Sequence, residues 1–258
     1  MNKREMYWNS RIPYTWKEIK ELKDYEYFRN VRYSLQDYMA ETIPFKDYKD
    51  KSILEIGCGS GIDLIEFTRN GALVTGIDFS YKAIDVTNRT LTLLELNKKS
   101  TALKMDAEHL KFPSNTFDLV YSFGVLHHIP NTEKVISEIH RVLKVGSKAI
   151  VMLYNKDSLL YNYSIIFLRG ILQKELESLT EEELLSKYSE YKEGCPYTRA
   201  YTSKEVRILF RAFKEINVSA HYNVYDSLET RKVKVPFLKE GSRLGWHLIV
   251  EASKYLRG

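Results

Sequence analysis

Lys51-Ser-Ile-Leu-Glu-Ile-Gly-Cys-Gly-Ser-Gly-Ile62 decides the fold, because a short apolar run ends there in three glycines at alternate positions. Ile53, Leu54 and Ile56 suit a buried strand, and glycine lets the chain turn sharply because it takes positive φ at no steric cost. The helix that follows such a turn presents backbone N–H groups and a partial positive charge to a ligand. The stretch therefore predicts a strand–turn–helix unit that binds a nucleotide-like molecule.

The spacing of the glycines and one carboxylate bear on which nucleotide binds. A dinucleotide turn has the order Gly-x-Gly-x-x-Gly, whereas Gly61 comes one place early and Ile62 stands where glycine is needed. Glu55 lies two residues before the turn. A carboxylate there would repel a pyrophosphate and attract an ammonium or sulfonium group. Both features disfavour NAD and favour a cationic ligand.

The order Glu55-x-Gly57-x-Gly59-x-Gly61 resembles the first motif of the class I S-adenosylmethionine (AdoMet) dependent methyltransferases. Later stretches resemble further motifs of the same family, in the same order and at similar distances. These stretches are Gly71–Asp78, Met105–Val120, Val125–Pro130 and Glu138–Gly146. The most similar branch is that of small-molecule enzymes, which includes the ubiquinone and menaquinone biosynthesis methyltransferases.

The resemblance implies a Rossmann-like α/β fold with a seven-stranded, mostly parallel sheet, the last strand antiparallel, and helices on both faces. Residues 51–153 would form the AdoMet-binding core and residues 202–258 the C-terminal part of its sheet. Residues 1–50 would form an N-terminal helical cover, and residues 154–201, where the family pattern breaks, an inserted substrate lid. These two outer segments hold 14 of the 19 tyrosines. Tyrosine suits a substrate pocket because it offers apolar area and one hydroxyl.

The helices of the outer segments can be anticipated from spacing and capping residues. Helical spacing around Trp16 and again from Phe28 to Tyr38 predicts two helices before residue 50. The apolar stretch Ser158–Leu172 predicts a lid helix; an interfacial membrane helix is the alternative, although its polar face holds little Lys or Arg. Thr180-Glu-Glu-Glu183 predicts a capping box, and Ser203 is expected to cap a helix from Lys204 to Ala212.

The resemblance also implies which residues hold AdoMet. Glu55 would bind the methionine ammonium group and Asp78 the two ribose hydroxyls. Asp106 and the N–H of Ala107 would read the edge of adenine. Phe79 would cover one adenine face, with a core contact as the alternative. The other predicted cofactor contacts come from the glycine turn and from the end of the fourth strand: Gly57, Cys58, Gly59, Gly61, Ser122 and Phe123.

His127 and His128 are the first candidates for catalysis. Methyl transfer to a hydroxyl or carbon acid needs a deprotonated acceptor, and histidine has a pKa near neutrality. The alternative is a family loop in which one histidine packs beside the cofactor. Arg199 and Tyr201 are second candidates, because similar loops in the family border the acceptor. Arg199 would clamp an anionic acceptor or pair with an acidic helix.

Composition narrows the function classes. The 258 residues suit one α/β domain with an elaboration, and no stretch approaches 20 apolar residues, so no membrane span is expected. The net charge of +5 and pI near 8.9, without a basic stripe, give weak support for nucleic-acid binding. Cys58 and Cys195 have no spacing typical of a disulfide or metal site, so no metal is expected. The charged N-terminus lacks a signal-peptide centre, which favours the cytoplasm.

We therefore predict an enzyme that transfers a methyl group from AdoMet to an oxygen or carbon of a small-molecule acceptor, leaving S-adenosylhomocysteine (AdoHcy). The absence of an Asn-Pro-Pro-aromatic motif after the fourth strand favours such acceptors over amino groups and nucleobases. A monomer or a homodimer is expected. The alternatives are an RNA methyltransferase, a catalytically idle AdoMet-binding regulator and a nicotinamide oxidoreductase.

Overall fold

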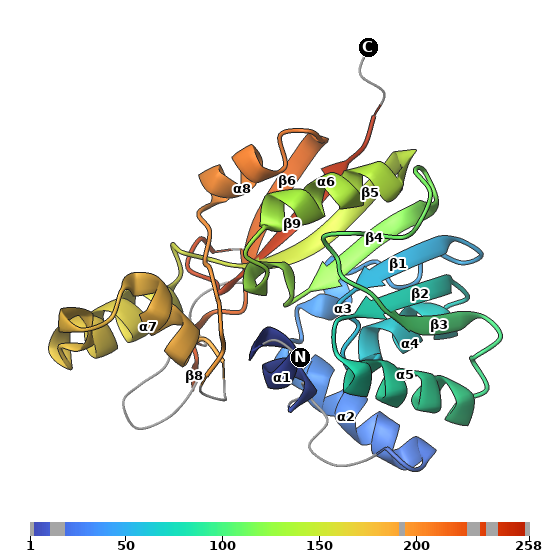
Figure 1. Ribbon diagram of the computed structural model, residues 1–258, viewed down its shortest axis with the longest axis horizontal. Coiled ribbons are helices and arrows are strands. Elements are labelled where there is room, and N and C mark those ends of the chain that lie inside the picture. Colours follow the sequence, from blue (N-terminus) through green and yellow to red (C-terminus); the bar gives the residue numbers. More distant parts are fainter. Residues whose placement is uncertain (1–2, 11–18, 191–193, 226–232, 236–241, 256–258) are drawn as a thin grey trace.

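A seven-stranded sheet forms the centre of the computed structural model, which describes residues 3–10, 19–190, 194–225, 233–235 and 242–255. Its strand order is β3-β2-β1-β4-β5-β9-β6 (Figure 1). The strands are β1 (Ser52–Ile56), β2 (Leu73–Asp78), β3 (Ser100–Lys104), β4 (Phe117–Phe123), β5 (Leu143–Tyr154), β6 (Lys214–His221) and β9 (His247–Ser253). A separate two-stranded ladder joins β7 (Val224–Tyr225) to β8 (Val233–Lys234).

Strand direction follows the expectation from the sequence. The five strands β1 to β5 pair in parallel, whereas β9 lies antiparallel between β5 and β6. The prediction of a mostly parallel sheet of seven strands, with the last strand antiparallel, is confirmed. The carboxyl ends of β1 to β5 and the amino end of β9 therefore meet along one edge, where sheets of this kind bind ligands.

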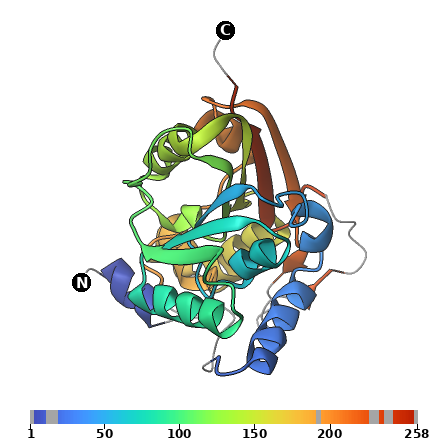
Figure 2. The ribbon, with the colours of Figure 1, turned by 90° about the vertical axis from the view of Figure 1, so that its right-hand side faces the viewer.

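Helices cover both faces of the sheet (Figures 1 and 2). Successive strand residues point to opposite faces, so the neighbours Ile53 and Leu54 belong to two different hydrophobic cores. The core around Ile53 includes α2, α3 and α4, and the core around Leu54 includes α6 and α8. The helices are α1 (Lys3–Asn9), α2 (Leu22–Leu35), α3 (Met39–Thr42), α4 (Ile62–Arg69), α5 (Tyr81–Leu93), α6 (Thr132–Val142), α7 (Glu181–Tyr188) and α8 (Ser203–Leu209), with short 3₁₀ turns η1 (Leu126–His128) and η3 (Glu175–Glu177).

The described residues of the N-terminal segment form three helices, whereas two were expected for the whole segment. Helix α1 lies beside α5 (Figure 2), and α2 packs against α4. The break between α2 and α3 comes at Gln36, whose backbone leaves the helical region. The helical spacing expected around Trp16 falls in residues 11–18, outside the described residues.

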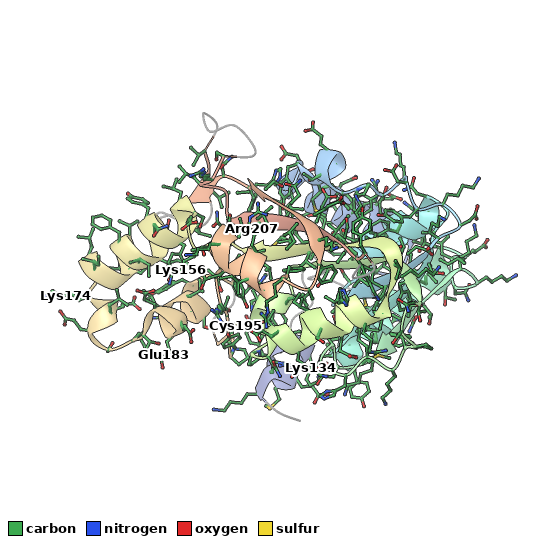
Figure 3. The ribbon with its side chains drawn as sticks, turned by 90° about the horizontal axis from the view of Figure 1, so that it is seen from above. Lys134, Lys156, Lys174, Glu183, Cys195 and Arg207 are labelled. Atoms are coloured by element: carbon green, nitrogen blue, oxygen red, sulfur yellow. The ribbon has the colours of Figure 1, made fainter. Side chains whose placement is uncertain are left out.

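The apolar stretch of the insertion forms a π-helix, η2 (Leu160–Leu172), which packs against α7. Seen from above, the part that holds Lys174 and Glu183 projects to one side of the sheet, and Cys195 lies closer to the body of the molecule (Figure 3). Leu160 and Ile165 are buried in the same core as α7. Among the described residues, no helix is both long enough and apolar enough to cross a membrane.

Capping confirms one prediction and corrects another. Glu183 N–H donates to Thr180 Oγ1 at 3.2 Å, and Thr180 N–H donates to Glu183 at 2.9 Å, as expected for a capping box. The cap of α8 is Thr202 and not Ser203, and the helix ends at Leu209 and not at Ala212. The reason is reciprocity: Thr202 has Glu205 three residues later, so both bonds of a capping box form, whereas Ser203 has a valine there.

Candidate active site

The turn after β1 is built for glycine. Gly57, Gly59 and Gly61 have φ of +75°, +55° and +77°, in the left-handed region that other residues seldom adopt. A Cβ on Gly57 would also lie 2.2 Å from a methyl carbon of Val125. The N–H of Gly57 donates to the carbonyl of Ile77 at 2.7 Å, which ties the turn to β2. The turn is thus fixed between β2 and the loop after β4.

A cavity of about 840 Å³ opens over this turn and follows the sheet edge. Its walls take residues from the ends of successive strands in spatial order: Asp106 after β3, Asp78 on β2, Glu55 on β1, Phe123 on β4, Tyr154 on β5 and His247 on β9. Carboxylates line the β3 to β1 half. Beyond β4 lies an aromatic end, which we define by Trp8, His128, Tyr154, Glu190, Tyr222 and His247.

Most of the predicted site residues line this cavity. They are Glu55, Gly57, Cys58, Gly59, Asp78, Phe79, Asp106, Ala107, Phe123 and His128. Gly61 instead packs against Thr87, and Ser122 is fully buried with its hydroxyl donating to the carbonyl of Ile56 at 3.0 Å. These two residues hold the turn and β4 in place and do not reach the cavity.

Glu55 brings a buried carboxyl group to the middle of the cavity. Its side chain is 3% exposed, and its Oε2 atom has no hydrogen-bond partner among the described residues. Burial holds the pKa of Glu55 well above its usual range, and the Asp63 carboxylate adds to this, whereas the Arg32 guanidinium opposes it. An acceptor left without a donor in a cavity wall fits a ligand that carries N–H groups and positive charge.

Asp63 ties the N-terminal segment to the cavity wall. Its carboxylate accepts from Arg32 Nη2 at 2.6 Å and Nε at 3.1 Å, from the Tyr33 hydroxyl at 3.0 Å and from the Tyr121 hydroxyl at 2.9 Å. The Arg32 guanidinium also lies over the Phe123 ring, 4.6 Å from its centroid. Charge-assisted bonds of this kind are strong, so α2 is firmly attached to α4 and β4.

Asp78 is oriented by backbone donors at the end of β2. One of its oxygens accepts from Gly59 N–H at 3.0 Å and the other from Ser80 N–H at 2.8 Å. Burial raises the pKa of Asp78, although both N–H groups act against that rise. A carboxylate has about four acceptor sites, so each oxygen can accept a further bond from a ligand hydroxyl.

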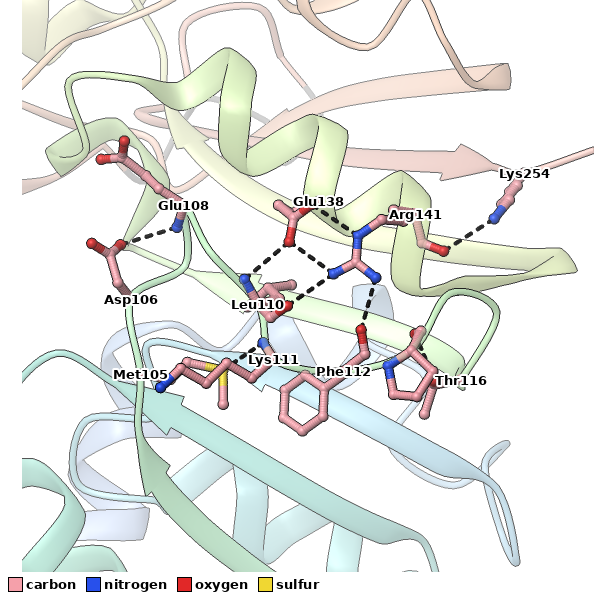
Figure 4. A network of polar contacts seen from close by, with 11 residues as sticks. Met105, Asp106, Glu108, Leu110, Lys111, Phe112, Thr116, Glu138, Arg141 and Lys254 are labelled. Atoms are coloured by element: carbon pink, nitrogen blue, oxygen red, sulfur yellow. Dashed lines mark hydrogen bonds and ion pairs between the residues drawn. The ribbon is translucent and has the colours of Figure 1, made fainter.

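The loop after β3 is held by α6 (Figure 4). Arg141 donates to the carbonyls of Leu110 at 2.9 Å and Phe112 at 2.7 Å, and also to Glu138. Glu138 accepts in turn from the N–H of Leu110 at 3.0 Å. This network holds the loop between β3 and β4, which takes the place of the helix found there in many α/β units. Asp106 lies at the start of this loop, so the network also helps to hold Asp106 at the cavity wall.

Helix α1 lies over the corner formed by Asp78 and Phe79. Arg4 lies over the Phe79 ring, 4.9 Å from its centroid. Glu5 accepts from Lys104 at 2.6 Å, and Asn9 accepts from the Ser80 hydroxyl at 2.8 Å. Polar contacts therefore hold α1 in place, and Arg4 and Phe79 both line the cavity.

His128 lies at the aromatic end and has polar partners at both ring nitrogens. Its Nδ1 lies 3.1 Å from the carbonyl oxygen of Tyr197, and its Nε2 lies 3.4 Å from Glu190. The Tyr154 hydroxyl donates to the same Glu190 oxygen at 2.6 Å. Burial alone would lower the pKa of His128, but contacts with Cys195 and Glu190 outweigh it and raise the pKa to about 10.

The other catalytic candidates do not line the cavity. His127 is fully buried, and its ring stacks on that of Tyr154 with centroids 3.6 Å apart, outside the cavity wall. Arg199 and Tyr201 line a separate hollow of about 320 Å³, where Tyr201 bonds to Thr132 at 3.0 Å and Arg199 pairs with Glu205 at 3.4 Å. The structure therefore brings only His128 of these four to the site.

The comparisons with known proteins point to one family. A family model described as a methyltransferase domain matches residues 54–151. The ubiquinone biosynthesis O-methyltransferase of Coxiella burnetii is 30% identical over 46% of this chain and 50% of its own length. An uncharacterized protein of Methanocaldococcus jannaschii is 32% identical over 62% of this chain and 74% of its own length. The chain belongs to the AdoMet-dependent methyltransferase family.

A solved structure agrees with this family in its fold. A methyltransferase of Methanosarcina mazei has a TM-score of 0.61 at 23% identity, covering 84% of this chain and 98% of that one. The chain spans between 35% and 50% of the length of the first curated relatives that it matches. The described residues hold no group of three or more His, Cys, Asp or Glu side chains suited to a metal ion.

The methyltransferase domain does not include most of the aromatic end. Trp8, Glu190, Tyr222 and His247 all lie outside the matched residues 54–151, and sequence reasoning named none of them as site residues. Trp8 and Glu190 lie in the outer segments, whose signal in the sequence was their density of tyrosines, whereas Tyr222 and His247 lie in residues 202–258 and had no such signal. The family part thus supplies the carboxylate half of the cavity, and the outer segments share the aromatic half with residues 202–258.

Proposed function

We propose that this protein transfers a methyl group from AdoMet to an oxygen or carbon of a small molecule. The observation that carries the proposal is the order of groups along the sheet edge: Asp106, Asp78 and Glu55 follow one another from β3 to β1. Adenine, ribose and the methionine ammonium group follow one another in the same order in AdoMet. The aromatic end then begins beyond β4, on the side where the methyl group would lie.

Each carboxylate suits its part of the cofactor. Glu55 would hold the ammonium group, because its buried Oε2 atom needs a donor and a cation beside it would offset the burial that raises its pKa. Asp78 would accept from both ribose hydroxyls, since Gly59 and Ser80 already fix its orientation. Asp106 would accept from the adenine amino group beside the N–H of Ala107.

The bound cofactor supplies a methyl group on a sulfonium, and the protein supplies position and a dry surrounding. Residues of helix α1, helix α2 and the insertion line the cavity, so they would limit the access of water to the acceptor. Holding two reactants at near-attack distance accounts for about 7–11 kcal/mol of barrier reduction in well-oriented systems. The aromatic end, with Trp8, Tyr154 and Tyr222, suits a small acceptor that has apolar surface.

The runner-up function is methylation of RNA, and a labelling experiment separates the two. The protein is incubated with AdoMet carrying a radioactive methyl group and with a cell extract divided into small metabolites and RNA. We expect protein-dependent label in the metabolite fraction. Label in the RNA fraction alone would support the runner-up, and AdoMet binding without transfer in either fraction would support a regulator.

A further inference from the structure

The aromatic end contains a carboxylate and an imidazole that come from different segments. Glu190 follows α7 in the insertion, and His128 ends the turn after β4. The two side chains lie within ion-pair distance, 3.4 Å, and both line the cavity. The Tyr154 hydroxyl donates to the Glu190 oxygen that faces His128. The same Glu190 oxygen therefore has a hydroxyl donor on one side and an imidazole on the other.

The partners of His128 suit an imidazole that carries a proton on both ring nitrogens. Nδ1 lies 3.1 Å from the carbonyl oxygen of Tyr197, which can only accept, and 3.2 Å from the Thr198 hydroxyl, which can accept as well as donate. Nε2 lies 3.4 Å from the Glu190 carboxylate, which also accepts. An imidazole with two protons is a cation and cannot take another. His128 is therefore unsuited to be the base, although it lies in the cavity.

Charge at the aromatic end then constrains the acceptor. His128 is paired with Glu190, and Arg32 is paired with Asp63. Among the described residues, these two cations thus have their counter-charge, which disfavours an anionic acceptor. A neutral acceptor must lose a proton when it gains a methyl group, because otherwise the product would carry the charge of the sulfonium.

We propose that Glu190 takes the proton that a neutral acceptor hydroxyl loses on methylation, while His128 remains a cation beside it. The inference rests on the proposed function. The acceptor oxygen forms its bond to the methyl carbon as the bond from methyl carbon to sulfur breaks and its electron pair stays on sulfur. The hydroxyl proton moves to Glu190, whose negative charge disappears together with the positive charge of the sulfonium. The proton leaves to water when the product is released.

The groups around His128 favour the same assignment. Glu190 and the Cys195 thiol face its two nitrogens, His127 lies 4.3 Å away, and the Tyr154 ring lies 5.8 Å away. Burial lowers the pKa of His128, but the contacts with Cys195 and Glu190 outweigh it and raise the pKa to about 10, above neutrality. Trp8 packs over His128 at 5.0 Å, which limits access of water.

The test compares Glu190→Gln with a matched control, Glu181→Gln. Glu181 lies in the same insertion and also accepts from a tyrosine, Tyr161, at 2.9 Å, but it does not line the cavity. The first readout is the ring ¹⁵N NMR spectrum at pH 8 with AdoHcy present, with the His128 signals assigned by their loss in His128→Gln. The second readout is AdoHcy formation with catechol as the probe acceptor.

We expect His128 to be doubly protonated at pH 8 in the wild type and in Glu181→Gln, and to lose a proton in Glu190→Gln. We expect turnover of catechol to fall by about 10²- to 10⁴-fold in Glu190→Gln, the range for loss of a general base, and to be kept in Glu181→Gln. A neutral His128 in the wild type, or full turnover in Glu190→Gln, would overturn the inference. If catechol is not turned over, the NMR result decides.

Calorimetry with AdoMet separates this inference from the proposed function. A wild type that does not bind AdoMet refutes the proposed function itself. A wild type that binds AdoMet but contains a neutral His128 refutes only the role of Glu190.

Discussion

Replacing Gly57 by alanine should destabilise the protein through two separate effects. The residue has φ of +75°, and the left-handed region costs an L-residue about 1–2 kcal/mol. The new Cβ would also lie 2.2 Å and 2.7 Å from the two methyl carbons of Val125 and 2.9 Å from its Cβ. Relieving such overpacking costs about 1–3 kcal/mol. The free energy of unfolding should therefore fall by about 2–5 kcal/mol.

Urea denaturation with two further variants separates these effects. Gly146→Ala is the matched control, because Gly146 has φ of +80° but no atom within 4 Å of its ideal Cβ, so only the backbone cost of about 1–2 kcal/mol remains. In a Val125→Ala background the two nearest atoms are absent, so Gly57→Ala should cost less there than in the wild type. Equal losses for Gly57→Ala and Gly146→Ala, or the same cost of Gly57→Ala in both backgrounds, would refute the steric argument.

Three further perturbations test other parts of the site. Glu55→Gln should weaken AdoMet binding in calorimetry. It should also stabilise the ligand-free protein above pH 4.5, because a carboxyl whose pKa rises on folding lowers the free energy of unfolding as the pH increases above that value. The pKa of His128 is raised from 6.5 to about 10, so its protonated form stabilises the fold fully below pH 6.5, and this stabilisation is lost as the pH rises toward 10. In chemical denaturation, the free energy of unfolding should therefore fall more steeply between pH 7 and pH 10 for the wild type than for His128→Gln. Arg141→Lys should lose the bonds to the carbonyls of Leu110 and Phe112, and so lower the free energy of unfolding by about 1–3 kcal/mol and weaken AdoMet binding. The control Arg89→Lys, at an exposed ion pair, should change neither the free energy of unfolding nor AdoMet binding.

The sheet and the carboxylate half of the cavity were predictable because their signals are local. The glycine turn follows its strand directly, so residues 51–62 contain both the turn chemistry and the apolar run. Asp78 and Asp106 each come at the end of a strand, and strand ends of a parallel sheet share one edge. Position in the sequence was therefore enough to bring these carboxylates together.

The aromatic end was not predictable in the same way. Trp8, Glu190 and His247 come from three segments far apart in the sequence, and only the packing of the outer segments brings them to one place. Tyr201 shows that a shift of one residue changes the side of the sheet that a side chain faces. Ala200 belongs to one hydrophobic core and Tyr201 to the other, so the tyrosine contacts Thr132 and does not reach the cavity. No spacing in the sequence determines that choice.

Calorimetry with AdoMet on three proteins tests the central claim most directly. The proteins are the wild type, Asp78→Ala and the control Asp118→Ala. Like Asp78, Asp118 accepts a hydrogen bond from a backbone N–H, that of Ser52; it also pairs with Lys144, but it does not line the cavity. We predict that the wild type binds AdoMet, that Asp78→Ala loses about 1–3 kcal/mol of binding free energy, and that Asp118→Ala binds like the wild type. A wild type that does not bind AdoMet would contradict the account, since every role given to the cavity depends on that cofactor.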